Sequence, residues 1–172
     1  GLGKLRTGPL LVPAARPRAY EPVQNSCLYV TGSALPFHVA GYTVRSQALI
    51  RAITAAGFQV TAALRPGYPG DRGIATPARS HRVGEVVYQH LPGPHVRRMP
   101  LDEFVEGAAA ALVALAERAR PQLIHAASNH VNALPALLAA RRVGVPFVYE
   151  VCGMWELTAA TRTPGVLFSA AT

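Results

Sequence analysis

The sequence has 172 residues, which suits one domain and is too short for two domains of ordinary size. Half of the residues are hydrophobic and only 15% are charged, so the chain can build a core and the composition typical of intrinsic disorder is excluded. Seventeen Lys and Arg against nine Asp and Glu give a formal net charge of +8, which favours phosphate-bearing partners such as nucleotides, anionic lipids or nucleic acid.

The first 25 residues are rich in Pro and Arg and show no sustained period, so we expect an irregular lead-in over residues 1–25. From residue 26 onward, short apolar runs alternate with longer helical stretches, which is the pattern of βα units. We assign residues 26–172 to one domain. Strands are predicted over residues 27–31, 58–64, 85–91, 122–126 and 146–151, and helices over residues 43–56, 101–120 and 129–142.

Turn-forming residues separate these elements. Gly57 and Gly144 are placed to end the first and third helices, and Pro121 follows the end of the second. Residues 65–73 contain too much Pro and Gly for regular structure, and this predicts a surface loop.

The alternation of strands and helices predicts an α/β fold with a doubly wound, mainly parallel, Rossmann-like sheet. Right-handed crossovers bring the carboxyl ends of parallel strands to one edge of such a sheet, and ligands bind there. The sequence has no dinucleotide-binding glycine fingerprint, no Walker loop and no nucleophile elbow, which excludes the α/β classes that depend on them. Candidate ligand residues follow the strands, in segments 32–41, 65–73, 125–132 and 150–156.

The loop after the first strand ends in Gly41 and Tyr42, at the start of a predicted helix. Backbone amides at a helix start can bind a phosphate, and a glycine lets a ligand approach the backbone closely. Gly41 and Tyr42 are therefore candidate phosphate-binding residues. The alternative is that Gly41 only makes a tight turn before the helix.

Polar residues also follow the fourth and fifth predicted strands. His125 ends a buried strand, and Ser128 and Asn129 open the next helix, where they offer hydrogen-bonding groups to a ligand; the alternatives are a core histidine and a helix cap. Glu150 emerges from an apolar strand, which is costly unless the carboxylate is paired or used. Its alternative role is an internal ion pair, with Arg45 as a candidate partner.

Five stretches of the sequence, at these same segments, resemble the amino-terminal half of a retaining glycosyltransferase of family four, which has the two-domain GT-B architecture. The resemblance covers residues 27–156 and departs from the family at two points. The usual His-Ala-His reads His125-Ala126-Ala127, and Cys152 stands where an arginine often follows Tyr-Glu-Val. The similar stretches are residues 33–45, 56–60, 120–128, 132–142 and 148–151.

This resemblance implies a transfer of sugar from a nucleotide-sugar to a sugar or lipid-linked acceptor, with retained configuration, in polysaccharide or glycoconjugate biosynthesis. The amino-terminal half would mainly supply the acceptor side, through His125, Glu150 and the neighbouring residues 128–129. Gly41 and Tyr42 would lie near the donor diphosphate. Stabilising the developing charge matters more in such a reaction than a strong base, so we name no catalytic residue, and we expect no metal or cofactor.

The resemblance also implies that the chain is a fragment, because the family's second domain, which holds the nucleotide-sugar pocket, has no counterpart in it. We also expect the last strands of the first domain to be missing after residue 168. Two alternatives stay open. In the first, the chain is a stand-alone nucleotide- or phosphate-binding module. In the second, it is a noncatalytic interaction domain that binds neither donor nor phosphate.

The sequence lacks an apolar run long enough to cross a bilayer and has no signal peptide pattern, so we expect a cytoplasmic location, with peripheral attachment to anionic membrane allowed. The positive charge is almost all arginine and is dispersed, which argues against a nucleic-acid partner. Cys27 and Cys152 are expected to be reduced and unbridged, at opposite edges of the sheet.

Overall fold

The computed structural model describes residues 20–75 and 79–153, which form an α/β domain as the sequence predicts. The strands and helices alternate along the chain, and a short 3₁₀ turn, η1, follows the second strand. In chain order the elements are β1 (Ser26–Thr31), α2 (Gly41–Ala55), β2 (Gln59–Leu64), η1 (Gly70–Arg72), β3 (Ser80–Val83), β4 (Val86–Gln89), α3 (Leu101–Ala119), β5 (Leu123–Ala127), α4 (His130–Val143) and β6 (Phe147–Glu150).

The described strands form one sheet in the order β3-β4-β2-β1-β5-β6. Every neighbouring pair is parallel except β3 and β4, which form an antiparallel hairpin. From β1 the chain first moves toward β2 and β4, and α3 then carries it back across β1 to β5. The strand order therefore reverses between β1 and β5, and this is the topological switch point where doubly wound sheets bind ligands.

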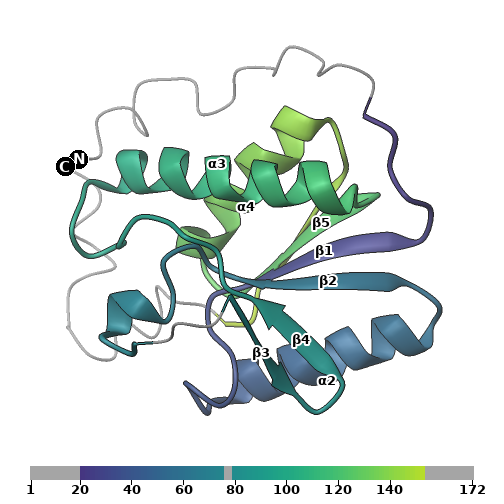
Figure 1. The fold of residues 1–172 in the computed structure, drawn as a ribbon, viewed down its shortest axis with the longest axis horizontal. Coiled ribbons are helices and arrows are strands. Elements are labelled where there is room, and N and C mark those ends of the chain that lie inside the picture. The colour runs from purple at the N-terminus through teal and green to yellow at the C-terminus, as the bar shows by residue number, and fades with distance from the viewer. Residues whose placement is uncertain (1–19, 76–78, 154–172) are drawn as a thin grey trace.

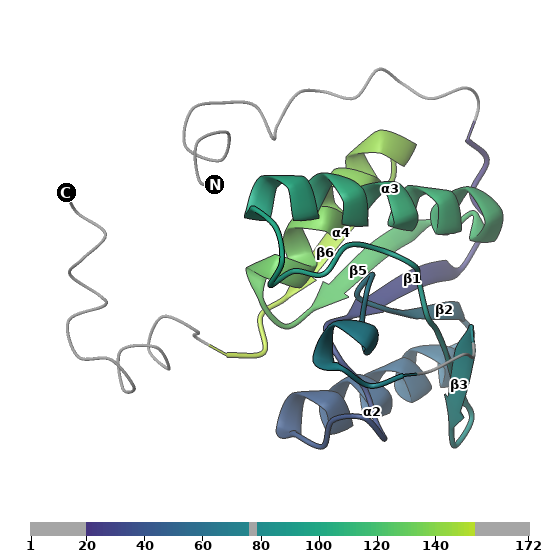
Figure 2. The same cartoon turned by 60° about the vertical axis from the view of Figure 1, so that its left-hand side comes forward.

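The helices cover the sheet from both sides. α3 and α4 lie together on one face and α2 lies on the other, as Figure 1 and Figure 2 both show. Residues of β1 alternate between the two layers, because successive side chains of a strand point to opposite faces. Leu28 and Val30 pack with α3 and α4, whereas Cys27 and Tyr29 pack in the cluster that contains Ile50 of α2.

The hairpin of β3 with β4 was not predicted, because the strands expected from the sequence do not include residues 80–83. β3 has the sequence Ser-His-Arg-Val, which shows no apolar alternation. Its backbone is extended because it pairs with β4, with Ser80 opposite Gln89 and Val83 opposite Val86. Gly84, between the strands, has a φ of +56°, a conformation that glycine adopts without strain.

The prediction that residues 65–73 form a surface loop is wrong for residues 65–69, whereas Gly70, Arg72 and Gly73 are exposed. Arg65, Tyr68 and the two prolines of this segment are buried, and the guanidinium of Arg65 pairs with Asp71 at 2.7 Å. At Gly67, where φ is +86°, a Cβ atom would lie 2.4 Å from the carbonyl oxygen of Pro94. The segment packs against the loop before α3 because glycine leaves room for that loop, and the ion pair offsets the burial of charge.

Residues 20–25 contain no helix or strand, as predicted for the end of the lead-in, yet they are attached to the domain. The hydroxyl of Tyr20 donates to the carbonyl of Pro121 at 3.0 Å, and the amide of Val23 donates to the carbonyl of Arg120 at 2.8 Å. Residues 1–19, and the end of the predicted domain at residues 154–172, lie outside the described residues.

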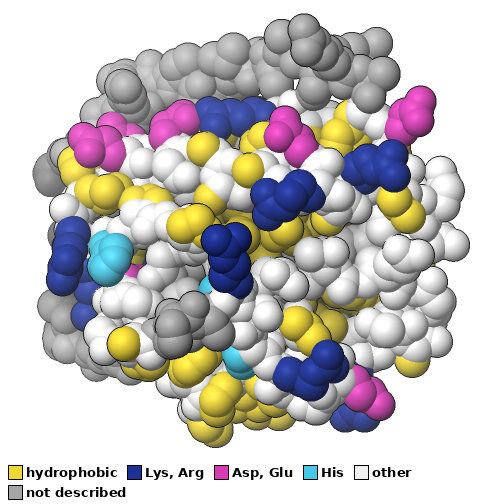
Figure 3. Space-filling model, in the orientation of Figure 1, with side chains coloured by type: hydrophobic (Ala, Val, Ile, Leu, Met, Phe, Trp, Pro, Cys, Tyr) yellow, Lys and Arg dark blue, Asp and Glu magenta, His cyan; other side chains and the backbone are white. Residues whose placement is uncertain are grey.

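Arginine side chains appear as separate patches on the face in Figure 3, whereas most of the visible acidic side chains lie along α3. No helix in the described part of the chain is long and apolar enough to span a bilayer.

The core between the sheet and α3 predicts a large effect of truncating Leu112, which is fully buried. Leu112→Ala should lower the free energy of unfolding by about 2–5 kcal/mol, because it removes apolar contacts and leaves a cavity. Urea unfolding at neutral pH measures the change. Val44→Ala is the control, since that side chain is 52% exposed and should change stability by less than about 0.5 kcal/mol.

Candidate functional site

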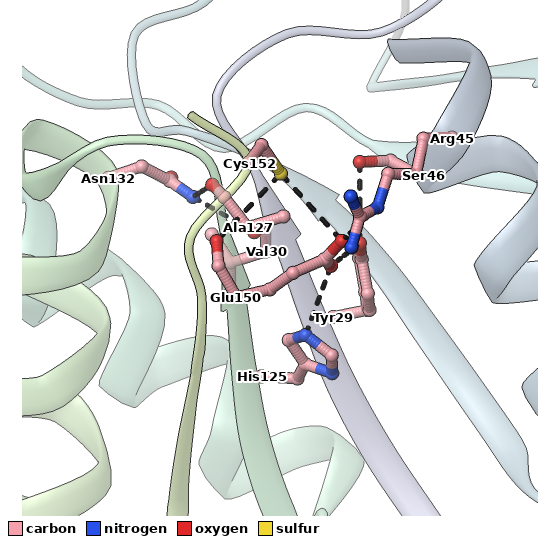
Figure 4. Close-up of polar contacts among 9 residues, drawn as sticks. All are labelled: Tyr29, Val30, Arg45, Ser46, His125, Ala127, Asn132, Glu150 and Cys152. Carbon is pink, nitrogen blue, oxygen red and sulfur yellow. Dashed lines mark hydrogen bonds and ion pairs between the residues drawn. The ribbon is translucent and has the colours of Figure 1, made fainter. Parts of the chain in front are cut away.

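Two groups of polar residues lie at the carboxyl edge of the sheet. The first, which we call the Glu150 cluster, consists of Glu150, Tyr29, Arg45, His125 and Cys152 and lies on the face that α2 covers in part. Figure 4 shows that these side chains converge from β1, α2, β5 and β6. The second group is a pocket that opens at the switch point between β1 and β5.

Both carboxylate oxygens of Glu150 are engaged within the chain. Nε of Arg45 lies 2.8 Å from Oε1, and the hydroxyl of Tyr29 donates to Oε2 at 2.7 Å. The side chain of Glu150 is 9% exposed, whereas that of Arg45 is 60% exposed. The ion pair with Arg45 that the sequence offered as an alternative is therefore present, and it places a solvent-facing guanidinium at the edge of the sheet.

His125 lies beside Glu150 because of the sheet register. β5 pairs His125 with Tyr29 on one side and with Val148 on the other, so its ring lies on the α2 face, 4.6 Å from the Tyr29 ring. Its Nε2 is 3.3 Å from Oε2 of Glu150, although no hydrogen bond of good geometry forms there. Burial lowers the pKa of His125, and the nearby Glu150 carboxylate opposes that shift only in part.

Cys152 packs against the same carboxylate. Its Sγ lies 3.7 Å from Oε1 of Glu150, and burial together with the Glu150 charge raises the pKa of the thiol. Burial also raises the pKa of the Cys27 thiol, to about 12. Both cysteines are free, which confirms the prediction that they are unbridged, and the raised pKa keeps both as thiols at neutral pH.

The second group surrounds a pocket of about 200 Å³, which we call the switch-point pocket. Its lining comes from the segments that follow β1, β2 and β5, from the start of α2 and from the loop before α3. The structure thus brings three of the sequence-predicted residues, Tyr42, Ser128 and Asn129, into one pocket, and His125 and Glu150 into the neighbouring cluster. Gly41 is exposed at the start of α2 and lines neither.

Asn129 occupies the N-cap position of α4, as expected, but its side chain makes no capping hydrogen bond. Its carbonyl accepts from the amides of Asn132 and Ala133, both at 3.0 Å, while the amides of His130 and Val131 have no carbonyl partner among the described residues. Ser128, just before it, is buried with a φ of +87°, which is strained for a residue with a Cβ. The start of α4 therefore presents unpaired N–H groups beside the pocket.

Three arginines line the switch-point pocket: Arg65, Arg72 and Arg97. Arg65 is buried against Asp71, while Arg72 and Arg97 are exposed and pair with no acid in the described ranges. Sequence reasoning directed attention to the segment of Arg65 and Arg72 but assigned them no role. Arg97 had no signal, because it lies in an irregular segment far from any strand end.

A larger cavity of about 580 Å³ lies between α2, β2 and β4. Its two charged residues, Arg51 and Glu85, face each other at 3.6 Å, and the other residues around it offer no cluster of titratable groups. Within residues 20–75 and 79–153 no three His, Cys, Asp or Glu side chains gather as metal ligands would. The switch-point pocket is therefore the better candidate for binding a polar substrate.

A doubly wound sheet with a polar pocket at its switch point defines a ligand-binding α/β domain of the Rossmann-like class. Residues 40–171 match the family described as the glycosyl transferase 4-like domain, and the chain belongs to this family. It is an amino-terminal domain of a family-four glycosyltransferase, and its sheet agrees with one half of a GT-B architecture. A comparison with curated proteins gave no match.

The lowered pKa of His125 predicts a pH dependence of stability. Below about pH 6.5, the ordinary pKa of histidine, His125 takes up a proton more readily in the unfolded chain than in the folded protein. The free energy of unfolding should therefore fall as the pH falls below about 6.5. His125→Gln should make this decrease shallower, and His130→Gln, at an exposed position, is the matched control. Urea unfolding between neutral pH and pH 5 gives the slopes, and identical slopes for all three proteins would contradict the prediction.

Proposed function

We propose that this chain is the acceptor-side domain of a retaining glycosyltransferase that moves a sugar from a nucleotide-sugar to an acceptor. The observation that carries the proposal is the arginine-lined, polar pocket at the switch point of a domain that belongs to the glycosyltransferase family. A ligand bound at this edge would face a second domain across a cleft in a GT-B enzyme, where donor and acceptor meet.

The donor diphosphate is assigned to the start of α2. The amides of Gly41 and Tyr42 have no carbonyl partner among the described residues, and Ala40, the N-cap residue, makes no side-chain capping bond. The first turn of α2 contains no acidic residue, and Gly41 is exposed with open space where a Cβ would be. The leaving diphosphate develops negative charge, and the unpaired amides and dipole at such a helix start stabilise that charge.

The acceptor is assigned to the other side of the pocket. Ser128 and Asn129 offer a hydroxyl and an amide that can hydrogen-bond to an acceptor. His125 and Glu150 have side chains only 12% and 9% exposed, so little of either is open to an acceptor, and Glu150 acts mainly by pairing with Arg45 at the edge of the sheet. We name no catalytic base, because transfer with retention depends on stabilising an oxocarbenium-like transition state and the leaving diphosphate.

The 172-residue chain by itself should transfer no sugar and should bind UDP-sugars and GDP-sugars weakly. In the architecture that we propose, most donor contacts belong to the second domain, and holding both substrates in one cleft contributes as much as ~7–11 kcal/mol in well-oriented reactions. Calorimetric titration of this chain, beside turnover assays of the full-length gene product, tests the expectation. NMR of the product's anomeric centre tests retention.

Two results would overturn the proposal. Transfer or tight donor binding by residues 1–172 would make the chain a complete enzyme rather than an acceptor-side domain. Phosphate binding by this chain without sugar transfer by the full-length product would favour a stand-alone phosphate-binding module instead.

The formal charge of +8 supports a further assignment, to an acceptor at an anionic membrane surface. The chain should sediment with vesicles that contain anionic lipid and remain in the supernatant with neutral vesicles. Added salt should reverse the binding, because exposed charges are screened. Equal binding to both kinds of vesicle would remove the electrostatic basis for membrane attachment.

A further inference from the structure

We propose that the switch-point pocket binds a phosphoryl group carried by the acceptor substrate. This inference rests on the proposed function only in naming the acceptor as the molecule that carries the phosphate. Phosphate binding itself can be measured without sugar transfer. It assigns the class of acceptor, a phosphorylated molecule, and the residues that recognise it: Arg72, Arg97, the buried Arg65 and the start of α4.

The size of the pocket fits a single phosphoryl group rather than a whole nucleotide. Its volume of about 200 Å³ lies below the roughly 300–1,000 Å³ of pockets that enclose a drug-sized ligand. Among the described residues that line it, Tyr42 has the only aromatic ring, and its hydroxyl lies 2.8 Å from Nδ1 of His38. Polar side chains and arginines make up most of the lining, which suits a compact oxyanion better than a nucleobase.

The charge of the pocket fits a phosphate monoester. Among the described residues, three arginines and one aspartate line it, so two positive charges stand in excess there. A phosphate monoester carries about −1.5 to −2 at neutral pH, and a carboxylate only −1. Arg72 and Arg97 have no acidic partner in the described part of the chain, so their guanidinium groups can turn to a ligand without breaking an ion pair.

An unpartnered buried group also points to a ligand here. The side chain of Arg65 is 8% exposed, and its Nη2 pairs with Asp71 at 2.7 Å, but its Nη1 has no hydrogen-bond partner among residues 20–75 and 79–153. A buried, unsatisfied guanidinium nitrogen is costly, and a phosphate oxygen would satisfy it once the Arg65 side chain turns toward the pocket. Oδ1 of Asp71, in the same ion pair, is also unpartnered among the described residues.

The start of α4 supplies further donors at the same place. The amides of His130 and Val131 are unpaired in the described structure, the Asn129 side chain does not cap the helix, and the first turn contains no acid. Helix N-termini with unpaired amides favour bound anions, because the N–H groups and the helix dipole act in the same direction. Val131 and Asn129 both line the pocket, so these donors and the arginines converge on it.

The test is an NMR titration of the 172-residue chain in low salt with inorganic phosphate, glucose 6-phosphate and UDP. Phosphate and glucose 6-phosphate should shift the amide resonances of residues 128–131. Arg97→Gln should weaken binding by about tenfold, since it removes a hydrogen bond from a charged donor, and Arg72→Gln should act similarly. Arg98→Gln removes the same charge from the next residue, which does not line the pocket, and should have no such effect.

The controls decide between the sources of the phosphate. Absence of shifts at residues 128–131, or equal weakening by Arg97→Gln and Arg98→Gln, would overturn the proposal. If UDP binds more tightly than glucose 6-phosphate, as measured from the shifts of the same amide resonances, the pocket belongs to the donor and the proposal of an acceptor phosphate is overturned. If phosphate binding passes these controls but the full-length product has no transferase activity, the assignment of the pocket to a phosphoryl group stands and the proposed function is refuted.

Discussion

The side-chain amide of Asn132 joins the two strands between which the order of the sheet reverses. Its Nδ2 donates to the carbonyl of Val30 at 2.9 Å, at the end of β1, and to the carbonyl of Ala127 at 2.7 Å, at the end of β5. The side chain is almost fully buried, so each bond forms where water cannot replace it (Figure 4). The amide thereby fixes α4 against both strand ends, and with it the position of the pocket between them.

The Glu150 cluster performs a similar task on the other face of the sheet. One carboxylate links β6 to Tyr29 of β1 and to Arg45 of α2, so three elements share a single buried charge. Removing a carboxylate from water is expensive, and the two close donors mainly offset that cost. The consequence is positional: the cluster sets where α2 begins relative to the sheet, and therefore where the amides of Gly41 and Tyr42 lie.

The switch-point pocket combines these two constraints with a third, the burial of Arg65. The segment after β2 folds inward because Gly67 allows close contact with Pro94 and because Asp71 pairs with the guanidinium. Its 3₁₀ turn then places Arg72 beside the starts of α2 and α4. Positive charge, unpaired amides and hydroxyl groups meet there because strands far apart in the sequence end at the same edge of a parallel sheet.

The amino-acid sequence by itself determined the order of the helices and of every described strand except β3, the helix ends at Gly57 and Gly144, and the segments after β1, β2, β5 and β6 that carry most of the site. These features depend on local periodicity and on backbone conformations that glycine permits, and both are visible within a few neighbouring residues. The chemistry of Glu150 followed the same logic, since a carboxylate at the end of an apolar strand needs a partner. Arg45 was foreseen as that partner.

The tertiary structure alone decided the rest. β3 is a strand because β4 pairs with it, the segment after β2 is buried because the loop before α3 packs against it, and Arg97 reaches the pocket from an irregular segment. The uncapped start of α4 also escaped prediction, because Asn129 suits a cap by its residue type, yet its side chain makes no capping hydrogen bond and the residue lines the pocket. Each of these features depends on contacts between residues distant in sequence. The free energies of such contacts outweigh local preferences, and the contacts produce no periodic pattern in the sequence.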